Sequence, residues 1–441
     1  QPMTPAGRLF IQEDLNQVIN CAVIGEFPVA SIDSIKAEIK NSIILRHPRF
    51  CSLVVRGSDG REYWRKTEVD IDRHLIVRGG RLSEDLAVPD EDVVNDYLAD
   101  LAYASPLPTD KPLWEVHVLM EHKCAVFRVH HALGDGVSLM SMLLTCCRKV
   151  DDPTKTPEMG GGAHLRRKKW SFGDLVKVTW FSLIFALELI ARFLWRRDKR
   201  TALRGGAGVE DWPRKVATAR FRLGDMKTVK AAVAGATIND VLFGVISNGF
   251  SRYLTLRSPE DVADGAQITG TAMVNLRQHP QLNLKVEESG ELETQWGNKF
   301  GMILLPVYYH KRESNPLDSV RRAKEMIDKK KLSLEAFFSY KLLHLITAKL
   351  ASIVNYRVIC NTTFTISNVV GPKEKISLAG NPVKCIRVTS SSLPHAITMH
   401  MVSYGGFADM QIQVAKEIIP DPRTLALCFQ DALLDMAQAS R

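Results

Sequence analysis

Two adjacent histidines and a nearby aspartate stand out in this 441-residue chain as residues that could do chemistry. They belong to the sequence HHALGDG at residues 130–136. A neutral imidazole suits general-base work, because its ordinary pKa lies near neutral pH. Neighbouring side chains of a strand point to opposite faces, so we expect one histidine to act on a substrate and the other to support it. Such a pair binds one metal ion poorly, and we predict no metal site.

The flanking sequence must place these residues at a corner between a strand and a helix. Residues 124–129 have a strand pattern, and the apolar residues 137–147 are typical of a buried helix. Asp135 lies between two glycines that permit a sharp turn, so its carboxylate can fix the corner by binding an arginine or backbone N–H groups. Without a Gly-x-Ser-x-Gly motif, the histidine would act directly on a bound hydroxyl. The alternative is a corner histidine that is simply packed into the core.

Strand and helix patterns alternate along the chain and predict an α/β protein with two halves. Residues 1–150 form the first expected domain, which carries HHALGDG, and residues 209–441 form the second. Residues 151–208 are expected to be a basic linker that contains a helix at about 172–195. The more specific predictions are a helix capped by Ser31, turns at 58–60 and 121–123, a helix break at Gly235, one long helix over 336–354 and a last helix starting at 421–422.

The positive charge of the chain is concentrated in the linker. The formal net charge is +9, and between Gly160 and Arg204 eleven Lys/Arg side chains face only Asp174, Glu188 and Asp198. An apolar insert divides these basic residues, whereas a nucleic-acid site would spread them over one folded face. The pattern therefore favours anionic lipid headgroups as a partner and excludes nucleic acid from the expected partners.

The apolar insert predicts a helix at a membrane surface. Residues 175–195 would span about 30 Å as a helix, but Lys177, Glu188 and Arg192 lie inside it and are costly in a bilayer core. A helix lying in the interface is favoured, a tilted span comes second, and a buried helix of a soluble domain is the third alternative. The side chains expected to contact the membrane are Trp170, Trp180, Phe181, Leu183, Phe185 and Trp195.

The eight cysteines are expected to be free thiols in a reducing compartment. None of them forms a Cys-x-x-Cys pair, and the first residues of the chain show no secretory signal. Both features argue against a disulfide framework.

HHALGDG resembles the HHxxxDG signature of the coenzyme A-dependent acyltransferases, a superfamily that includes chloramphenicol acetyltransferase. The surrounding sequence resembles the wax ester synthase/diacylglycerol acyltransferase family, in its plant branch. The supporting motifs occur in the family's order, as TPAGRLF at 4–10, PLWE at 112–115, ATINDV at 236–241, VNLR at 274–277, WGNKFG at 296–301 and ISNVVGP at 366–372. The late DFGWG motif of the plant phenolic acyltransferases is absent from the sequence.

This resemblance implies two chloramphenicol-acetyltransferase-like domains with an active-site tunnel at their interface. It implies His131 as the base, supported by His130 and Asp135, with acyl-CoA as co-substrate and no other cofactor. The expected reaction moves a fatty acyl group to a long-chain alcohol and forms a wax ester. The alternatives are transfer to diacylglycerol, which gives triacylglycerol, and a non-catalytic lipid-binding protein. The implied location is the endoplasmic reticulum membrane, with the domains facing the cytosol, or else the plasma membrane.

Several further residues are candidates for positioning the substrate or an oxyanion. Asn239 would come from the second half, but Thr237 and Asp240 resemble a capping box, so residues 239–240 could equally begin a helix. Other candidates either line the pocket or serve turns, and the turn role is favoured for Asn275, Asn298 and Asn368. Gly136 lies at the corner itself. Arg277 is the expected structural partner of Asp135.

Overall fold

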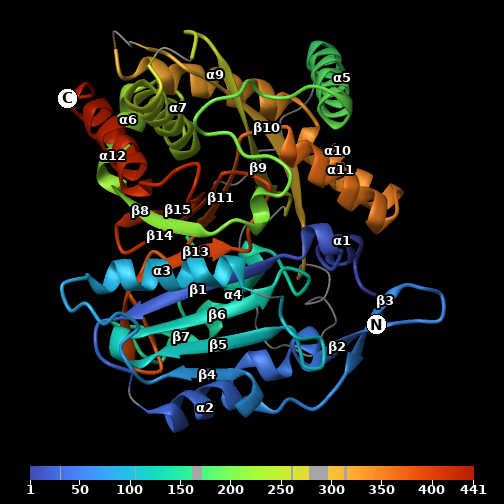
Figure 1. Cartoon of the computed structure of the whole chain (residues 1–441), viewed down its shortest axis with the longest axis vertical. Helices are drawn as coiled ribbons and strands as arrows, with labels where there is room; N and C mark the ends of the chain where they lie inside the picture. The colour runs from blue at the N-terminus through green and yellow to red at the C-terminus, as the bar shows by residue number, and fades with distance from the viewer. Residues whose placement is uncertain (30, 105, 161–170, 260–261, 278–295, 312–314) are drawn as a thin grey trace.

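Two large β-sheets, one in each half of the molecule, organise the computed structural model of the chain (Figure 1). The structure describes residues 1–29, 31–104, 106–160, 171–259, 262–277, 296–311 and 315–441. A small hairpin of β2 (Ser52–Arg56) and β3 (Glu62–Lys66) stands beside the first sheet.

The first sheet has seven strands and takes its members from both ends of the chain. In spatial order they are β4 (Leu75–Arg78), β5 (Trp114–Leu119), β6 (Cys124–His130), β1 (Val18–Gly25), β13 (Asn381–Ser390), β12 (Ile376–Leu378) and β7 (Cys147–Lys149). The second sheet has six strands, in the order β10 (Phe300–Tyr308), β9 (Gln267–Asn275), β11 (Phe364–Val370), β14 (Ile397–Tyr404), β15 (Phe407–Ala415) and β8 (Arg214–Arg222).

Helices pack on faces of both sheets. The described helices are α1 (Pro5–Phe10), α2 (Ile32–Asn41), α3 (Asp90–Tyr103), α4 (Gly136–Thr145), α5 (Phe172–Leu194), α6 (Leu223–Ala232), α7 (Ile238–Arg257), α9 (Asp318–Leu332), α10 (Glu335–Leu345), α11 (Ala348–Cys360) and α12 (Pro422–Gln438). Buried side chains of α6, α7, α9 and α12 form the largest core against the second sheet. In the first sheet, α3 packs on one face and α4 on the other.

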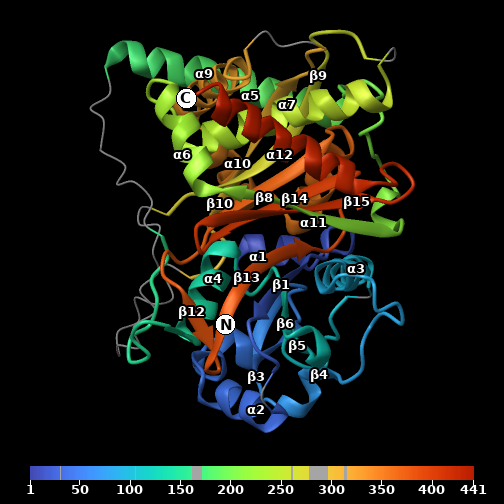
Figure 2. The same ribbon diagram turned by 90° about the vertical axis from the view of Figure 1, so that its left-hand side faces the viewer.

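Strand β13 ties the two halves together. It is antiparallel to β1, with Ile19 opposite Ser390, although 371 residues separate the two along the chain. The first half in space is therefore larger than residues 1–150, since it also includes β12 and β13 from the segment expected to form the second domain. Figure 2 shows the two halves stacked, with β13 running along the first sheet below the second.

Most local predictions agree with the elements observed. Ser31 caps α2 through its side chain, β5 and β6 form a hairpin, and Gly235 separates α6 from α7 with a φ of +68°. The long helix expected over 336–354 is wrong, because the chain breaks at Ile346 and Thr347 caps a new helix, α11. The break allows α10 and α11 to pack in different directions beside α1.

Candidate active site

His131 lies one residue beyond the end of β6, where the strand meets the corner that leads to α4. Its backbone N–H donates to the Gln17 carbonyl at 2.8 Å, which extends the pairing of β6 with β1. The two histidines point in different directions, as the strand geometry predicts. His130 is buried, its Nδ1 accepts from the Ala132 N–H at 3.1 Å, and its Nε2–H therefore donates to Asn16 Oδ1 at 2.9 Å.

Asn298 fixes the tautomer of His131. The Asn298 Nδ2 group donates to the His131 backbone carbonyl at 2.8 Å, and a carbonyl can only accept. The amide oxygen Oδ1 must then face His131 Nδ1, 3.0 Å away, so that Nδ1 carries the proton and donates. The other ring nitrogen, Nε2, keeps its lone pair, and no hydrogen bond from the described residues occupies it. This is the protonation state that a general base requires.

Aromatic rings hold the imidazole of His131 in place. Phe10, at the end of α1, stacks on it with ring centroids 4.0 Å apart, and Phe300 lies 5.7 Å away at a steeper angle. Burial lowers the pKa of His131, while Asp135 and the Asn298 hydrogen bond act in the opposite direction. Burial also lowers the pKa of His130, to about 3. Both imidazoles are therefore neutral at neutral pH.

The corner itself is fixed by Asp135, which begins α4 as its N-cap. Its Oδ1 accepts from the Ser138 N–H at 3.0 Å, and its Oδ2 accepts from Arg277 at 2.7 Å and from the Lys299 N–H at 2.9 Å. The expected contact between Arg277 and Asp135 is thus present. Arg277 also donates to the Gly297 carbonyl at 2.6 Å, which connects the corner to the segment that carries Asn298. Asp135 acts on the base by holding these segments together.

His131 faces a large cavity at the junction of the two halves, which we call the catalytic cavity. It encloses about 1620 Å³, including its open mouth, and it is bordered by both sheets and by helices α1, α5, α10 and α11. Leu189, Leu342, Leu343, Ile346 and Val358 give the helical side of the cavity an apolar wall. Polar side chains such as Ser367, Asn368 and His400 line other parts of the cavity. A mainly apolar wall beside such polar groups is typical of a ligand site.

The asparagines predicted for turns have different environments. Asn275 does serve a turn, because its Oδ1 accepts from the Arg277 N–H at 3.1 Å, and it also lines the catalytic cavity. The turn role is wrong for Asn298, which orients His131, and for Asn368, which lies within β11 and lines the cavity.

The sequence predicts that residues 239–240 either help to position the substrate or begin a helix, and the structure has features of both. Asp240 completes a capping box with Thr237 at the start of α7. Asn239 lies outside the residues that line the cavity, but its Oδ1 accepts from Asn368 Nδ2 at 3.0 Å and so helps to hold that side chain. At the corner, Gly136 borders the cavity, and a Cβ added there would come within 2.9 Å of Val369 Cγ2.

A second histidine in the cavity escaped the sequence-based predictions. His400 on β14 contacts Ser367 Oγ through Nδ1 at 2.8 Å and Ser390 Oγ through Nε2 at 3.1 Å. Burial lowers its pKa to about 4, so the ring is neutral. These hydrogen bonds join β11, β14 and β13, and thus both sheets, at the wall of the catalytic cavity. A lone histidine in an alternating strand gives no sequence signal of such partners.

Helix α5 contributes to the cavity and also presents an apolar face to solvent. Ser171 and Asp174 form a capping box at its start, and Val178, Phe185 and Leu189 pack inward. Trp180, Leu183 and Trp195 are exposed, Phe181 is half-buried, Phe185 is buried, and Trp170 lies outside the described residues. In the part of the chain that the structure describes, no helix is both long and apolar enough to cross a membrane.

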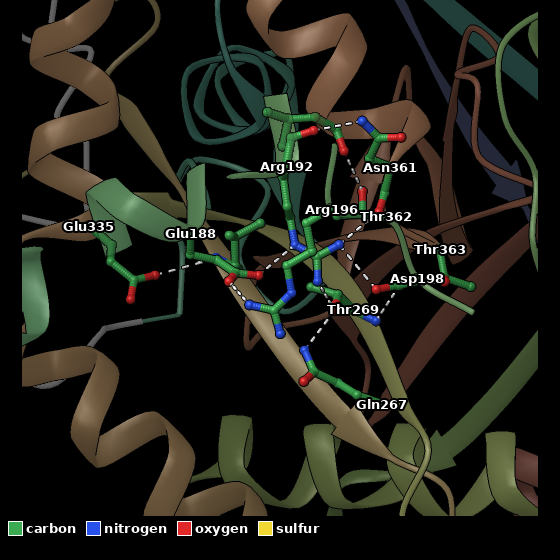
Figure 3. A network of polar contacts seen from close by, with 12 residues as sticks. Glu188, Arg192, Arg196, Asp198, Gln267, Thr269, Glu335, Asn361, Thr362 and Thr363 are labelled. Atoms are coloured by element: carbon green, nitrogen blue, oxygen red, sulfur yellow. Dashed lines mark hydrogen bonds and ion pairs between the residues drawn. The ribbon is translucent and has the colours of Figure 1, made fainter. Parts of the chain in front are cut away.

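The C-terminal end of α5 is attached to the second sheet through Arg192, which is 1% exposed (Figure 3). Its guanidinium donates to Glu188 at 2.8 Å, Asp198 at 3.0 Å, the Asn361 carbonyl at 2.7 Å and Thr269 Oγ1 at 2.6 Å. Asp198 in turn accepts from the Thr269 N–H at 2.6 Å and from Thr363 at 2.7 Å. Two of the three charges that argued against a membrane-spanning helix, Glu188 and Arg192, therefore belong to the network that docks α5 on the protein, whereas Lys177 is exposed.

Two family models match this chain. Residues 41–184 match the wax ester synthase/diacylglycerol acyltransferase catalytic domain, and residues 296–437 match the WS/DGAT C-terminal domain. Wax ester synthase/diacylglycerol acyltransferase 11 of Arabidopsis thaliana is 33% identical over 96% of this chain and 92% of that protein. Wax ester synthase/diacylglycerol acyltransferase 2 of Arabidopsis thaliana is 34% identical over 100% of this chain and 96% of that protein.

Solved structures agree on the fold. The wax ester synthase/diacylglycerol acyltransferase from Marinobacter aquaeolei VT8 matches over all of both chains, with a TM-score of 0.63 and 16% identity. The trichothecene 15-O-acetyltransferase TRI3 from Fusarium sporotrichioides has a TM-score of 0.60 and 12% identity, and the match covers 100% of this chain and 95% of that one. The two-domain acyltransferase architecture is thus shown. With its intact HHALGDG corner, the chain belongs to the wax ester synthase/diacylglycerol acyltransferase family and is an acyl-CoA-dependent O-acyltransferase.

Proposed function

We propose that this enzyme transfers a fatty acyl group from acyl-CoA to a long-chain alcohol and forms a wax ester. The observation that carries the proposal is the Nε2 lone pair of His131, which Asn298 sets and no hydrogen bond from the described residues occupies, beside a large cavity with an apolar helical wall. The helical wall of the cavity is mainly apolar, which favours a fatty acceptor over a polar one. A fatty alcohol gains about 0.8 kcal/mol for each CH₂ group that it buries there.

The chemistry follows from the position of this lone pair. His131 Nε2 takes the proton of the alcohol hydroxyl as the oxygen attacks the thioester carbonyl. The tetrahedral intermediate then collapses, the C–S bond breaks, and the protonated imidazole returns its proton to the departing thiolate of coenzyme A. Asn298 keeps Nδ1 protonated throughout, so that the same nitrogen handles the proton in both steps.

The test is ester formation by the purified enzyme and its His131→Ala variant. Palmitoyl-CoA is offered with hexadecanol and dipalmitoylglycerol in competition, and the neutral lipids are identified by mass spectrometry. We expect mainly the wax ester, and a loss of about 10²–10⁴ in rate for His131→Ala. Triacylglycerol as the main product would overturn the choice of acceptor. Unchanged turnover in the variant would remove His131 from the mechanism, and no ester from either acceptor would favour a lipid-binding role.

We further propose that α5 holds the enzyme on a lipid surface that supplies the alcohol. Helices α10 and α11 lie next to α5 at one side of the molecule (Figure 1), and α10 also carries exposed apolar side chains, among them Phe337, Phe338 and Leu345. The same three helices wall the catalytic cavity. The endoplasmic reticulum remains our prediction for the membrane concerned, to be tested by cell fractionation.

A further inference from the structure

A second apolar space lies inside the first half of the molecule, between α4 and the first sheet. We call it the inner hollow. Its walls are Ile19 and Cys21 of β1, Phe127 and Val129 of β6, Val388 of β13 and a roof of α4 side chains that includes Leu139 and Leu143. Every residue that lines it is apolar, a glycine or a cysteine. Protein cores normally close such space, because even a cavity of methyl size costs about 1 kcal/mol.

The inner hollow adjoins the catalytic cavity at the corner that carries the base. The two spaces share Ile19, Gly136, Val369 and Val388 as wall residues. A Cβ added at Gly136 would come within 2.9 Å of Val369 Cγ2, another of these shared residues. A larger residue at 136 would therefore reduce the space where the two cavities adjoin.

A third space, the outer hollow, continues the same path toward α2. It shares Ile44, Phe127 and Cys146 with the inner hollow and is walled further on by Val23, Gly25 and Ile39. Alternate residues of β1 thus line the path in order, Ile19 and Cys21 first and then Val23 and Gly25, because residues two apart share one face of a strand. From Ile19 to Gly25 a strand covers about 20 Å, which is comparable to an extended long acyl chain.

We propose that the inner and outer hollows hold the fatty chain of acyl-CoA, with Cys146 at the position where the chain passes from one to the other. The assignment rests on the proposed function. The helical wall of the catalytic cavity borders exposed apolar helices, which suits an acceptor that arrives from lipid. An acyl chain that arrives on water-soluble coenzyme A needs an apolar space, and the hollows provide a mainly apolar one that adjoins the catalytic cavity at the corner beside the base.

The first test is the chain-length preference of Cys146→Phe, with Cys146→Leu as a milder variant and Leu434→Phe, on the exposed side of α12, as the matched control. We expect Cys146→Phe to lower kcat/KM for palmitoyl-CoA at least tenfold relative to octanoyl-CoA, and Cys146→Leu to give a smaller change in the same direction. The preference among alcohols should not change, and Leu434→Phe should behave like the wild type. A shift in the alcohol preference, or no shift at all, would overturn the assignment.

A second test does not need turnover. The rate of alkylation at Cys146 is followed by peptide mapping with N-ethylmaleimide in the wild-type protein. Palmitoyl-CoA should slow it at least fivefold, whereas coenzyme A alone should not. If palmitoyl-CoA and coenzyme A protect Cys146 equally, or if neither protects it, the acyl chain does not lie in the hollows. If palmitoyl-CoA protects Cys146 but no ester forms with any alcohol, the proposed function fails and the acyl site stands.

Discussion

At the scale of single residues, Asn298 makes His131 a base with one defined lone pair. In Asn298→Leu the ring would lose the acceptor of its Nδ1 proton, and the neutral tautomer that carries the proton on Nε2 would become accessible. We expect kcat to fall at least tenfold, which corresponds to about 1.4 kcal/mol. Because the Asn298 hydrogen bond raises the pKa of His131, its loss should also move the acid limb of the pH–rate profile to lower pH. The measurement is kcat/KM between pH 4 and 9.

A merely structural role for Asn298 would not move that limb. Asn298→Asp offers the comparison, since a carboxylate still accepts from Nδ1 but stabilises the protonated ring, and it should move the limb to higher pH. If the acid limb lies at the same pH in the wild type and in both Asn298 variants, Asn298 does not set the protonation of His131.

Whether a contact in the site can be predicted from the sequence depends on how far apart its two residues are along the chain. HHALGDG is local, so its corner, its N-cap and the opposite directions of its histidines could be predicted. Arg277 could be proposed for Asp135 because a buried carboxylate needs a cation. Asn298 could not be separated from a turn residue, since its contact with His131 spans 167 residues and only the folded sheets bring the two together. The same holds for His400 and its two serines.

At the scale of elements, α5 shows which features of a helix can be predicted from its own sequence and which cannot. The capping box at Ser171 and the apolar periodicity predict its start and its amphipathic character. Arg192 argued against a membrane-spanning helix, but nothing in the sequence indicated its partners inside the protein, where it is among the most buried side chains of the molecule. Its partners are Thr269 on β9, the Asn361 carbonyl before β11 and Asp198 in the segment after α5 (Figure 3). With its end fixed in this way, the helix presents its exposed side as a rigid face.

That face predicts binding to anionic membranes. Trp180 and Leu187 are 60% and 58% exposed, and Lys177, Arg196 and Arg200 are exposed cations near them along the chain. Replacing both apolar residues by Gln should weaken binding to vesicles containing phosphatidylserine at least tenfold in flotation assays, because each buried apolar side chain contributes about 1.5–3 kcal/mol. The control is Leu427→Gln with Leu434→Gln, two exposed leucines on α12. Equal flotation of the two double variants would locate the membrane contact elsewhere.

At the scale of the whole molecule, the sequence predicts two α/β halves but not how they are joined. Strand β13 pairs on one edge with β12, its neighbour in sequence, and nothing in its residues indicates that its other edge pairs with the distant strand β1. The consequence is functional, since β13 carries Ser390 and Val388 into the walls of the catalytic cavity and the inner hollow. The break between α10 and α11 is similar, because packing against α1 and β10 selects it over one continuous helix.

Buried histidines in both halves also make the stability of the whole fold depend on pH. Four buried histidines have pKa values lowered by burial, His130 and His395 to about 3 and His47 and His400 to about 4. Unfolding returns each to about 6.5, so the unfolded chain binds more protons below that pH. Their contribution to stability is complete above pH 6.5 and is lost progressively as the pH falls toward 4. Each histidine then costs up to about 1.4 kcal/mol per pH unit.

Urea unfolding at pH 7.5, 6.5, 5.5 and 5.0 measures this loss. The midpoint should be nearly constant between the first two values and should fall steeply below pH 6.5. His395, which is buried and bonded to Thr362 and Thr365 at 2.7 and 2.8 Å, provides the test variant, and the exposed His344 provides its control. His395→Gln should lower stability at every pH but flatten its decline, because one protonation no longer opposes folding, whereas His344→Gln should leave the decline unchanged. A midpoint independent of pH down to 5.0 would show that these imidazoles reach solvent without unfolding.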